Sequence, residues 1–249
     1  MPKRAYFRFY EELNDFLPPQ RKKTEFPYEF TGTPSVKDAI EAIGVPHTEV
    51  DLVLANGESV TFSYQLGDSD TISVYPVFES LDISPVTRLR PKPLRTLKFI
   101  LDVHLGKLAR YLRMLGFDTL YETSYDDMDI VAIAQREKRI ILTRDRELLK
   151  MKAVTHGYWI RSTNSREQAV EVIRRFDLAS SVKPFYRCLA CNGIIIQAEK
   201  DSVLPYIEAG TKSCFEEFYR CSSCGKIYWK GTHYERMEKS IEKLLKDKI

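Results

Sequence analysis

Two aspartates stand at or just past the ends of short apolar runs. The run 97–101 ends on Asp102, and the run 139–143 is followed by Arg144 and Asp145. Such runs, with helical periods between them, are typical of a parallel α/β sheet. In such a sheet, residues just past the carboxyl ends of the strands face the ligand crevice. If the two strands are neighbours, the two carboxylates converge, which is how proteins hold Mg²⁺ or Mn²⁺.

Further acids lie between and after the two runs. Residues 126–129 read Asp-Asp-Met-Asp and precede a segment with apolar residues at helical spacing. Asp126 can cap this helix, and Asp127 and Asp129 fall in its first turn, where carboxylates suit the helix dipole in any case. Each acid alone has an ordinary explanation. Two strand-end carboxylates and a first-turn acid together are a complete set of ligands for a metal site. Glu147 is either a fourth acid or a helix-start residue.

The cysteines indicate a second metal. Two C-x-x-C pairs stand near the end of the chain, and a redox site would need only one such pair. Each pair delivers two thiolates on one turn, and tetrahedral Zn²⁺ takes four thiolates at short range. We therefore expect a structural zinc site, with glycines at 193 and 225 in the turns. The expected zinc ligands are Cys188, Cys191, Cys221 and Cys224.

Basic and aromatic residues suggest where nucleic acid would bind. On the predicted helix 105–115, Lys107 and Arg110 lie in the first turns near Asp102, and Arg113 is expected on the same outer face. In the cysteine region, basic and aromatic residues interleave, which suits phosphate contact and base stacking. Solvated charges and aromatic packing on a neighbouring domain are the other interpretation. The candidate RNA-binding residues are Lys107, Arg110, Arg144, Lys226, Trp229 and Lys230.

Composition excludes several classes of protein. The chain has 43% hydrophobic residues, enough for a sizeable core, and a net charge of +3, which permits nucleic-acid binding without arguing strongly for it. It has no glycine-rich phosphate loop, no Ser-His-Asp set and only four histidines, which argues against NTPases, serine hydrolases and histidine-pair ribonucleases. We find no signal peptide and no membrane-spanning run, so we expect a cytoplasmic protein without a membrane partner.

The first eighty residues predict a β-grasp. Strands are expected at 4–10, 26–30 and 71–77. A helix is expected between them, with Thr33 as its cap, Pro34 at its first position, apolar residues at 36, 39, 40 and 43, and its end at Gly44. Asn56-Gly57 marks a hairpin. The hairpin and the residues 66–72 resemble the ubiquitin-like sulfur carriers. Those carriers end in an activated Gly-Gly tail, whereas this chain continues, so we expect a module for binding or orientation, with a protein partner, that is not conjugated.

The central and last parts of the chain resemble a nuclease family. The motifs are Phe99-Ile-Leu-Asp102, the helix sequence Leu105-Gly-Lys-Leu-Ala-Arg110, Asp127 and Ile141-Leu-Thr-Arg-Asp145, followed by both cysteine pairs. They are similar to the Mut-seven C-terminal RNase domain, a family of PIN-like nucleases, over residues 97–235. The resemblance implies a metal-dependent ribonuclease that leaves a 3′-hydroxyl and a 5′-phosphate. It matches Asp102, Asp127 and Asp145 to the acidic metal-binding positions, and Asp129 and Glu147 less firmly.

The expected architecture is a multidomain α/β and α+β chain. It comprises a ubiquitin-like β-grasp at 1–80, a basic proline-containing linker at 81–96, a PIN-like parallel-sheet domain at 97–182, and a zinc ribbon with a C-terminal helix at 183–249. The expected cofactors are catalytic Mg²⁺ or Mn²⁺ and structural Zn²⁺, and the expected partner is RNA. The alternative function is a non-catalytic RNA-binding or adaptor protein with structural acids.

Overall fold

The computed structural model describes residues 2–76, 89 and 97–246. The chain divides into two compact units, one built from residues 1–96 and 145–159 and the other from residues 97–144 and 160–249. The chain therefore leaves the second unit after Arg144 and rejoins it at Ile160. The basic linker predicted at 81–96 lies outside the described residues except for Leu89, which packs against the core of the first unit.

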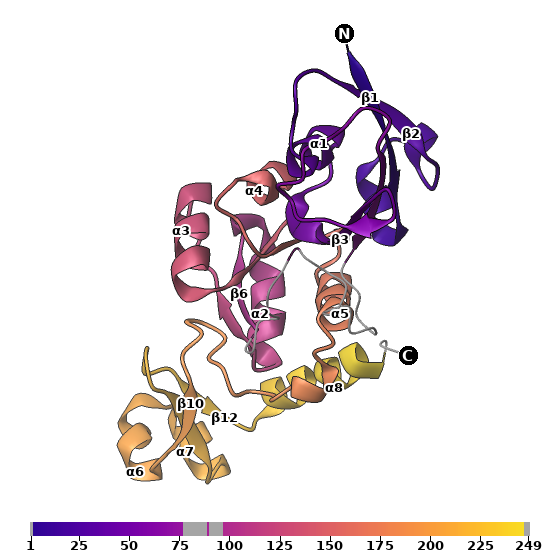
Figure 1. Cartoon of the computed structure of the whole chain (residues 1–249). Coiled ribbons are helices and arrows are strands. Elements are labelled where there is room, and N and C mark those ends of the chain that lie inside the picture. Colours follow the sequence, from indigo (N-terminus) through magenta and orange to yellow (C-terminus); the bar gives the residue numbers. More distant parts are fainter. Residues whose placement is uncertain (1, 77–88, 90–96, 247–249) are drawn as a thin grey trace. The chain divides into compact units, whose positions relative to one another are not determined.

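The first unit contains a five-stranded mixed sheet in the order β2-β1-β5-β3-β4 (Figure 1). The central strands β1 and β5 are parallel, and the other pairs are antiparallel. Its elements are β1 (Lys3–Phe9), β2 (Phe26–Phe30), α1 (Val36–Ile43), β3 (Val50–Ala55), β4 (Glu58–Ser59) and β5 (Thr71–Pro76), with α4 (Arg146–Lys150) and β9 (Gly157–Trp159) from the second segment. Two strands, a helix, a hairpin and a final strand confirm the predicted β-grasp.

Local signals set the ends of the first helix and the hairpin. The N-cap of α1 is Ser35, whose hydroxyl accepts the amide of Asp38 in a capping box, so the expected cap Thr33 is wrong. Ser35 has the extended backbone that a cap needs, directly before the first helical residue. Asn56 and Gly57 have φ angles of 53° and 86°, and two positive φ angles are what a two-residue hairpin requires.

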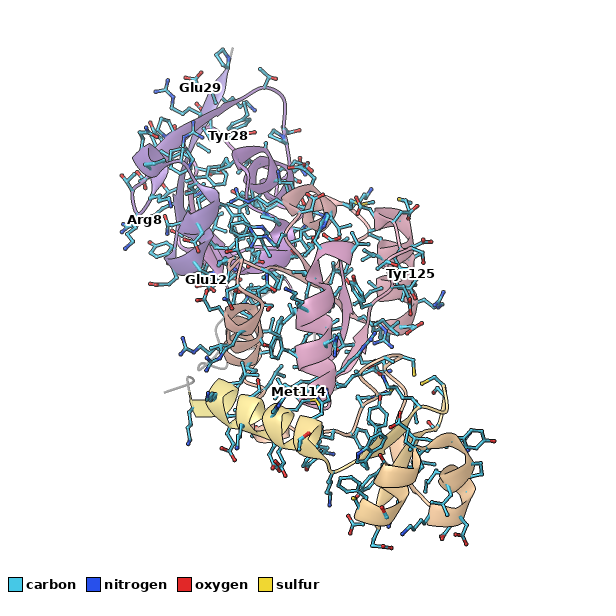
Figure 2. All side chains as sticks on the ribbon, turned by 180° about the vertical axis from the view of Figure 1, so that it is seen from behind. Arg8, Glu12, Tyr28, Glu29, Met114 and Tyr125 are labelled. Atoms are coloured by element: carbon cyan, nitrogen blue, oxygen red, sulfur yellow. The ribbon has the colours of Figure 1, made fainter. Side chains whose placement is uncertain are left out.

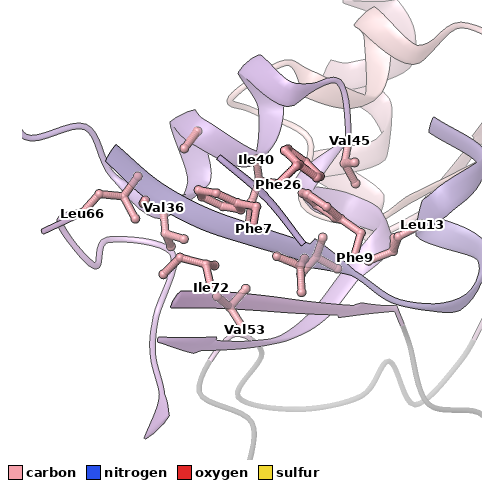
Figure 3. Packing of buried hydrophobic residues seen from close by; sticks show 14 of the residues in the cluster. Phe7, Phe9, Leu13, Phe26, Val36, Ile40, Val45, Val53, Leu66 and Ile72 are labelled. Atoms are coloured by element: carbon pink, nitrogen blue, oxygen red, sulfur yellow. The ribbon is translucent and has the colours of Figure 1, made fainter. Parts of the chain in front are cut away.

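Alternating aromatic residues build the core of the first unit. Along β1 the side chains of Ala5, Phe7 and Phe9 are buried and their neighbours are more exposed. Figure 3 shows Phe7, Phe9 and Ile40 of α1 meeting in this core, and the rings of Phe9 and Phe26 stack with centroids 6.1 Å apart. Burying one such ring contributes roughly 1.5–3 kcal/mol.

The second unit is built around the parallel strands β7, β6 and β8, which belong to a four-stranded sheet in the order β7-β6-β8-β9. The chain passes from β6 to β7 on one side, and then from β7 to β8 across β6. Parallel crossovers are right-handed, so the two connecting helices α2 and α3 lie on opposite faces of the sheet (Figure 1). The elements are β6 (Lys98–Leu101), α2 (Gly106–Met114), β7 (Asp118–Leu120), α3 (Asp127–Glu137), β8 (Ile140–Thr143) and α5 (Ser165–Arg175).

The last part of the second unit is a small antiparallel sheet followed by a helix. The strand order is β10-β11-β12. The helix α8 packs against α5, which in turn packs against α2. The elements are β10 (Ile195–Ala198), α6 (Lys200–Val203), α7 (Ala209–Cys214), β11 (Phe218–Cys221), β12 (Ile227–Trp229) and α8 (Thr232–Lys246). The fold class predicted from the sequence is therefore confirmed.

Short 3-10 helices connect the larger elements. The sequence also predicts a strand at 153–160 and, after it, a helix capped by Ser165, and the structure differs on both points. The cap of α5 is Asn164, which accepts the amides of Arg166 and Glu167, rather than Ser165. The strand expected at 153–160 is limited to β9, because turns occupy the preceding residues up to Val154. No helix in the described part of the chain combines the length and apolar character needed to cross a bilayer. The 3-10 helices are η1 (Glu11–Phe16), η2 (Pro19–Arg21), η3 (His47–Glu49), η4 (Val103–Leu105), η5 (Ala179–Ser181) and η6 (Leu204–Tyr206).

Candidate functional site

Asp102 and Thr143 meet where the strand order of the parallel sheet reverses. Leu101 of β6 is in register with Leu142 of β8, and the amide of Asp102 donates to the carbonyl of Leu142 at 3.1 Å. The hydroxyl of Thr143 then donates to Oδ2 of Asp102 at 2.7 Å. The strands β6 and β8, which lead to Asp102 and Thr143, are thus neighbours, which is the condition that the sequence analysis set for convergent carboxylates. Ligands of doubly wound sheets bind at this reversal point.

The carboxylate of Asp102 is buried, and no described residue supplies a counter-charge to it. The residue is 7% exposed, and its neighbour Thr143 is 0% exposed. Within the described residues, Oδ1 of Asp102 has no hydrogen-bond partner and the carboxylate has no ion-pair partner. A buried charge that lacks compensation is costly, and a cation at the site would relieve this cost.

The first turn of α3 stands at the same edge of the sheet. The helix follows β7, which runs parallel to β6, so its N-terminus lies at the carboxyl edge where Asp102 ends its strand. Asp126 caps the helix, as predicted, and its Oδ1 accepts the amide of Asp129 at 2.8 Å. The carboxylate of Asp129 in turn accepts the amide of Asp126 at 3.4 Å. Asp127 begins the helix and is exposed.

Asp145 and Glu147 belong to the first unit. Oδ1 of Asp145 accepts the amide of Glu147 at 2.8 Å and so caps α4. The carboxylate of Glu147 pairs with Lys150 at 2.8 Å on an exposed surface. The two units, each taken by itself, do not bring Asp145 together with Asp102 and Asp127, and the three-carboxylate metal site stays a prediction.

The four predicted zinc ligands form one cluster. Their four Sγ atoms all lie within 4.8 Å of one another, and this is the group of potential metal ligands found among the described residues. The Sγ atoms of Cys188 and Cys224 are 3.7 Å apart, and those of Cys191 and Cys221 are 3.4 Å apart. Tetrahedral Zn²⁺ with Zn–S bonds of about 2.3 Å needs sulfur atoms about 3.8 Å apart. The cluster therefore fits a zinc ion.

Both cysteine turns share one backbone pattern. The amide of Cys188 donates to the carbonyl of Gly193, and the amide of Cys221 donates to that of Lys226, five residues on in each case. The residue four positions after each first cysteine has a positive φ, 68° at Asn192 and 73° at Gly225. Gly193 was expected to play the turn role of Gly225, but it serves close packing instead. A Cβ atom there would lie 2.7 Å from the Sγ of Cys221.

The surroundings shift the pKa values of two thiols of the cluster in opposite directions. Burial raises the pKa of the Cys191 thiol to about 12. Burial also acts to raise the pKa of Cys188, but the hydroxyl of Tyr228, 3.0 Å from its sulfur, and nearby backbone amides lower that pKa to about 6. Tyr228 is thus engaged by a thiol of the cluster. Thiols at such short range are all ionised only when a cation binds them.

Arg113 joins the cysteine turns to the parallel sheet, a role that the sequence analysis missed. Its side chain is 3% exposed, so its expected place on the charged outer face of α2 is wrong. The guanidinium donates to the carbonyl of Thr119 at 2.9 Å and to that of Ala190 at 2.9 Å. Burial lowers the pKa of Arg113. Its apolar stem suits the helix face, and the carbonyls replace the water that a buried guanidinium loses.

Asp118 and Asn192 complete the same junction. The amide of Asn192 donates to Oδ1 of Asp118 at 2.8 Å, and its side-chain oxygen accepts the backbone amide of Thr119 at 2.9 Å. Asp118 also pairs with Arg139 at 2.6 Å and with Arg187 at 3.2 Å. The side chain of Asn192, in the first cysteine turn, therefore accepts a backbone amide at the edge strand β7, in the place where a further strand would offer a carbonyl.

A basic groove lies beside this junction. Lys107 and Arg110 of α2 line it together with His233 and Arg236 of α8, and its volume is about 550 Å³. Figure 2 shows Met114, a further lining residue, at the end of α2 next to α8. No carboxylate is among the described residues that line the groove. The groove thus offers positive charge to a phosphate chain, and both Lys107 and Arg110 line it. Their contact with RNA stays a prediction.

The other candidate RNA-binding residues have varied surroundings. Trp229 is 37% exposed and, with Lys230, lines a second pocket of about 380 Å³ together with several tyrosines. Lys230 pairs with Glu217 at 2.9 Å, while the ammonium of Lys226 lies 5.9 Å from the ring centroid of Tyr228. Arg144 donates to the carbonyls of Arg161 and Ser162, which gives it a structural role in its own loop.

These features define a β-grasp followed by a PIN-like α/β domain that carries a four-cysteine ribbon. The chain belongs to the Mut7-C RNase domain family, whose model matches residues 97–241, more than half of the chain. A second family model, the Mut7-C ubiquitin domain, matches residues 2–82. The comparisons with curated proteins and with solved structures give no match. The family points to ribonuclease activity and to RNA as the substrate.

Proposed function

We propose that this protein is a metal-dependent ribonuclease whose reaction takes place at the carboxyl edge of the parallel sheet. Asp102, Asp127 and Asp145 would hold Mg²⁺ or Mn²⁺. The observation that carries the proposal is the buried carboxylate of Asp102, fixed through one oxygen by Thr143 and left with its other oxygen free among the described residues. Oxygen ligands of this kind suit both metals.

The course of the backbone supports the proposal that Asp127 and Asp145 are ligands of the same metal site as Asp102. Asp127 lies at the first turn after β7, on the same edge of the sheet as Asp102. Asp145 is two residues beyond Thr143, and two residues of chain span at most about 7 Å, so covalent continuity keeps its backbone close to the hydroxyl that fixes Asp102. The capping box of Asp129 and the ion pair of Glu147 favour structural roles for these two acids.

The residues of the site have distinct tasks in this proposal. A divalent cation bound there would supply positive charge to the attacking water and to the leaving oxygen. Thr143 orients the carboxylate of Asp102, and burial of that carboxylate keeps bulk water away from it. Lys107 and Arg110, with His233 and Arg236, bind phosphates of the RNA in the basic groove.

The pocket around Trp229 would take an unpaired base. Tyr219, Tyr234 and Trp229 line it, and aromatic faces stack on any base, whereas Lys230 at its rim offers charge. We therefore expect single-stranded RNA to bind better than a perfect duplex, whose bases are stacked already.

A cleavage assay with the full chain tests the function. Single-stranded and structured RNAs should be cut in Mg²⁺ or Mn²⁺ to products with a 3′-hydroxyl and a 5′-phosphate, and EDTA should stop the reaction. Cleavage that continues in EDTA, or products with 2′,3′-cyclic phosphates, would contradict metal-dependent hydrolysis. RNA binding without cleavage under every metal condition would favour the adaptor function.

A further inference from the structure

Residues 145–159 form an excursion that starts at the proposed reaction edge. The segment follows Arg144 directly, and the amide of Ile160, the first residue after it, donates to the carbonyl of Thr143 at 2.8 Å. Both ends of the excursion are therefore tied to the carboxyl end of β8. Its body, with α4 and β9, groups with the first unit and contacts η3 there, and β9 is also the strand next to β8 in the sheet β7-β6-β8-β9.

Two buried side chains of η3 hold the excursion. The carboxylate of Glu49 accepts the amide of Trp159 at 2.6 Å. The Nε2 atom of His47 lies 2.8 Å from the carbonyl oxygen of Val154, so this nitrogen carries the proton and donates. Nδ1 of His47 lies 2.5 Å from the carboxylate of Glu41, which orients the ring. Glu49 is 0% exposed and His47 is 6% exposed, so water does not compete for these bonds.

Aromatic contacts hold the two ends of the excursion together. The ring centroids of Phe16 and Trp159 are 5.0 Å apart. The guanidinium of Arg146 lies 4.1 Å from the ring centroid of Trp159 and 5.1 Å from that of Phe16. A cation over an aromatic face is attracted by it, more strongly where water is excluded. Arg146 is the residue directly after Asp145.

The orientation of Asp145 depends on this packing. Its Oδ1 accepts the amide of Glu147, so the carboxylate is fixed to the first turn of α4. That helix is held by its buried residues Leu148 and Leu149 and by its contacts with η3 and β9. Whatever positions α4 on the β-grasp therefore positions the carboxylate of Asp145.

We propose that the β-grasp unit acts within its own chain as a clamp that sets the position of Asp145, with His47 and Glu49 as positioning residues. The consequence for catalysis rests on the proposed function, because Asp145 matters to the reaction only if it is a metal ligand. The holding of residues 145–159 does not rest on it. In this proposal the β-grasp positions a residue of the reaction site, in addition to any role it has in binding a protein partner.

Hydrogen exchange tests the clamp without reference to catalysis. Glu49→Ala in the full chain should speed exchange of the Trp159 and Glu147 amides about tenfold or more. The local opening that exposes these amides costs less free energy when the bond to Glu49 no longer has to be broken. Glu49→Gln keeps an acceptor oxygen and should restore much of the protection. The matched control is Glu58→Ala, an exposed acid of β4 in the same unit. Unchanged exchange in Glu49→Ala overturns the clamp.

A second variant guards against loss of folding in Glu49→Ala. Phe16→Leu keeps an apolar side chain of similar size and removes the ring under Trp159 and Arg146. It should raise the acrylamide quenching of Trp159, measured in a Trp229→Phe background because the chain has two tryptophans. Quenching equal to that of the background protein contradicts the clamp.

Kinetics tests the consequence for Asp145. In Glu49→Ala, kcat should fall about 10–100-fold, as for other residues that orient metal ligands, with KM nearly unchanged. More Mn²⁺ should be needed for the half-maximal rate, and Glu49→Gln should recover activity. Faster exchange together with unchanged kcat and metal dependence would overturn the positioning role. A wild-type chain that cuts no RNA, while Glu49→Ala still changes the exchange, would overturn the ribonuclease function and leave the clamp standing.

Discussion

The hydroxyl of Thr143 holds Oδ2 of Asp102 at 2.7 Å, and this bond joins the carboxyl ends of two adjacent parallel strands. Both residues are buried, so neither can move far without disturbing the sheet. The bond leaves the second oxygen of the carboxylate free among the described residues. Thr143 therefore fixes the orientation of the Asp102 carboxylate at the proposed reaction edge.

Replacing Thr143 by Val should lower kcat about 10–100-fold, because the carboxylate of Asp102 loses the donor that orients it. Thr119→Val is the matched control, since Thr119 is also a buried strand threonine but its hydroxyl donates to the carbonyl of Phe117. Each substitution should cost about 1 kcal/mol of stability for one hydrogen bond. Equal rates for the two variants would show that Thr143 has no special role.

The junction around Asp118 should make stability depend on acid pH. Burial acts to raise the pKa of Asp118, but hydrogen bonds from Arg139 and Asn192 outweigh it and hold the pKa below its ordinary value. A depressed pKa stabilises the fold above the unfolded-state pKa of about 3.9, and this contribution is lost as the pH falls through the folded-state pKa. Asp118→Asn should therefore destabilise the protein by about 3 kcal/mol at pH 7 and by less at low pH. Denaturation curves from pH 7 to pH 3 measure the difference, and a difference independent of pH would contradict this role.

The cysteine cluster should bind about one zinc ion per chain, because four thiolates complete the tetrahedral shell. A Cys188→Ser, Cys191→Ser protein should lose the metal and unfold at lower temperature. Cys214 is exposed and outside the cluster, so Cys214→Ser is the control and should keep its zinc. Elemental analysis of the purified proteins gives the answer, and full zinc content in the double variant would contradict the site.

RNA affinity should fall with salt, and the basic groove should account for part of the slope. Each lost phosphate contact should flatten the logarithmic slope by about 0.7 on single strands, so Lys107→Ala with Arg110→Ala should change it by about 1.4. Arg136→Ala is the control, because this exposed arginine lies in the last turn of α3 and does not line the groove. A slope that changes equally in both proteins would show general charge loss.

The sequence predicted what depends on local periodicity. The spacing of apolar residues identified the strands ending at Asp102 and Thr143 and the helix beginning at Asp127, and the cysteine spacing identified the cluster. Caps were harder, because Ser35 lies close to Thr33 and Asn164 lies next to Ser165, and any of these side chains can cap a helix.

The missed features depend on partners far away in the sequence. Arg113 bonds the carbonyl of Ala190, 77 residues later, and no helical pattern shows that a basic side chain will find buried carbonyls there. His47 and Val154 are separated by 107 residues. The packing of residues 145–159 on the β-grasp therefore became visible only in three dimensions.

The most direct test of the account compares Asp102→Asn with Asp126→Asn in RNA cleavage with Mg²⁺, Mn²⁺ or EDTA, alongside thermal melts. Asparagine keeps the shape of Asp102 but removes an anionic ligand, so cleavage should fall by orders of magnitude while folding survives. Asp126→Asn should be mild, because asparagine also caps helices well. Cleavage that persists in Asp102→Asn, or a wild-type protein that is inactive on every RNA, would contradict the proposed ribonuclease site.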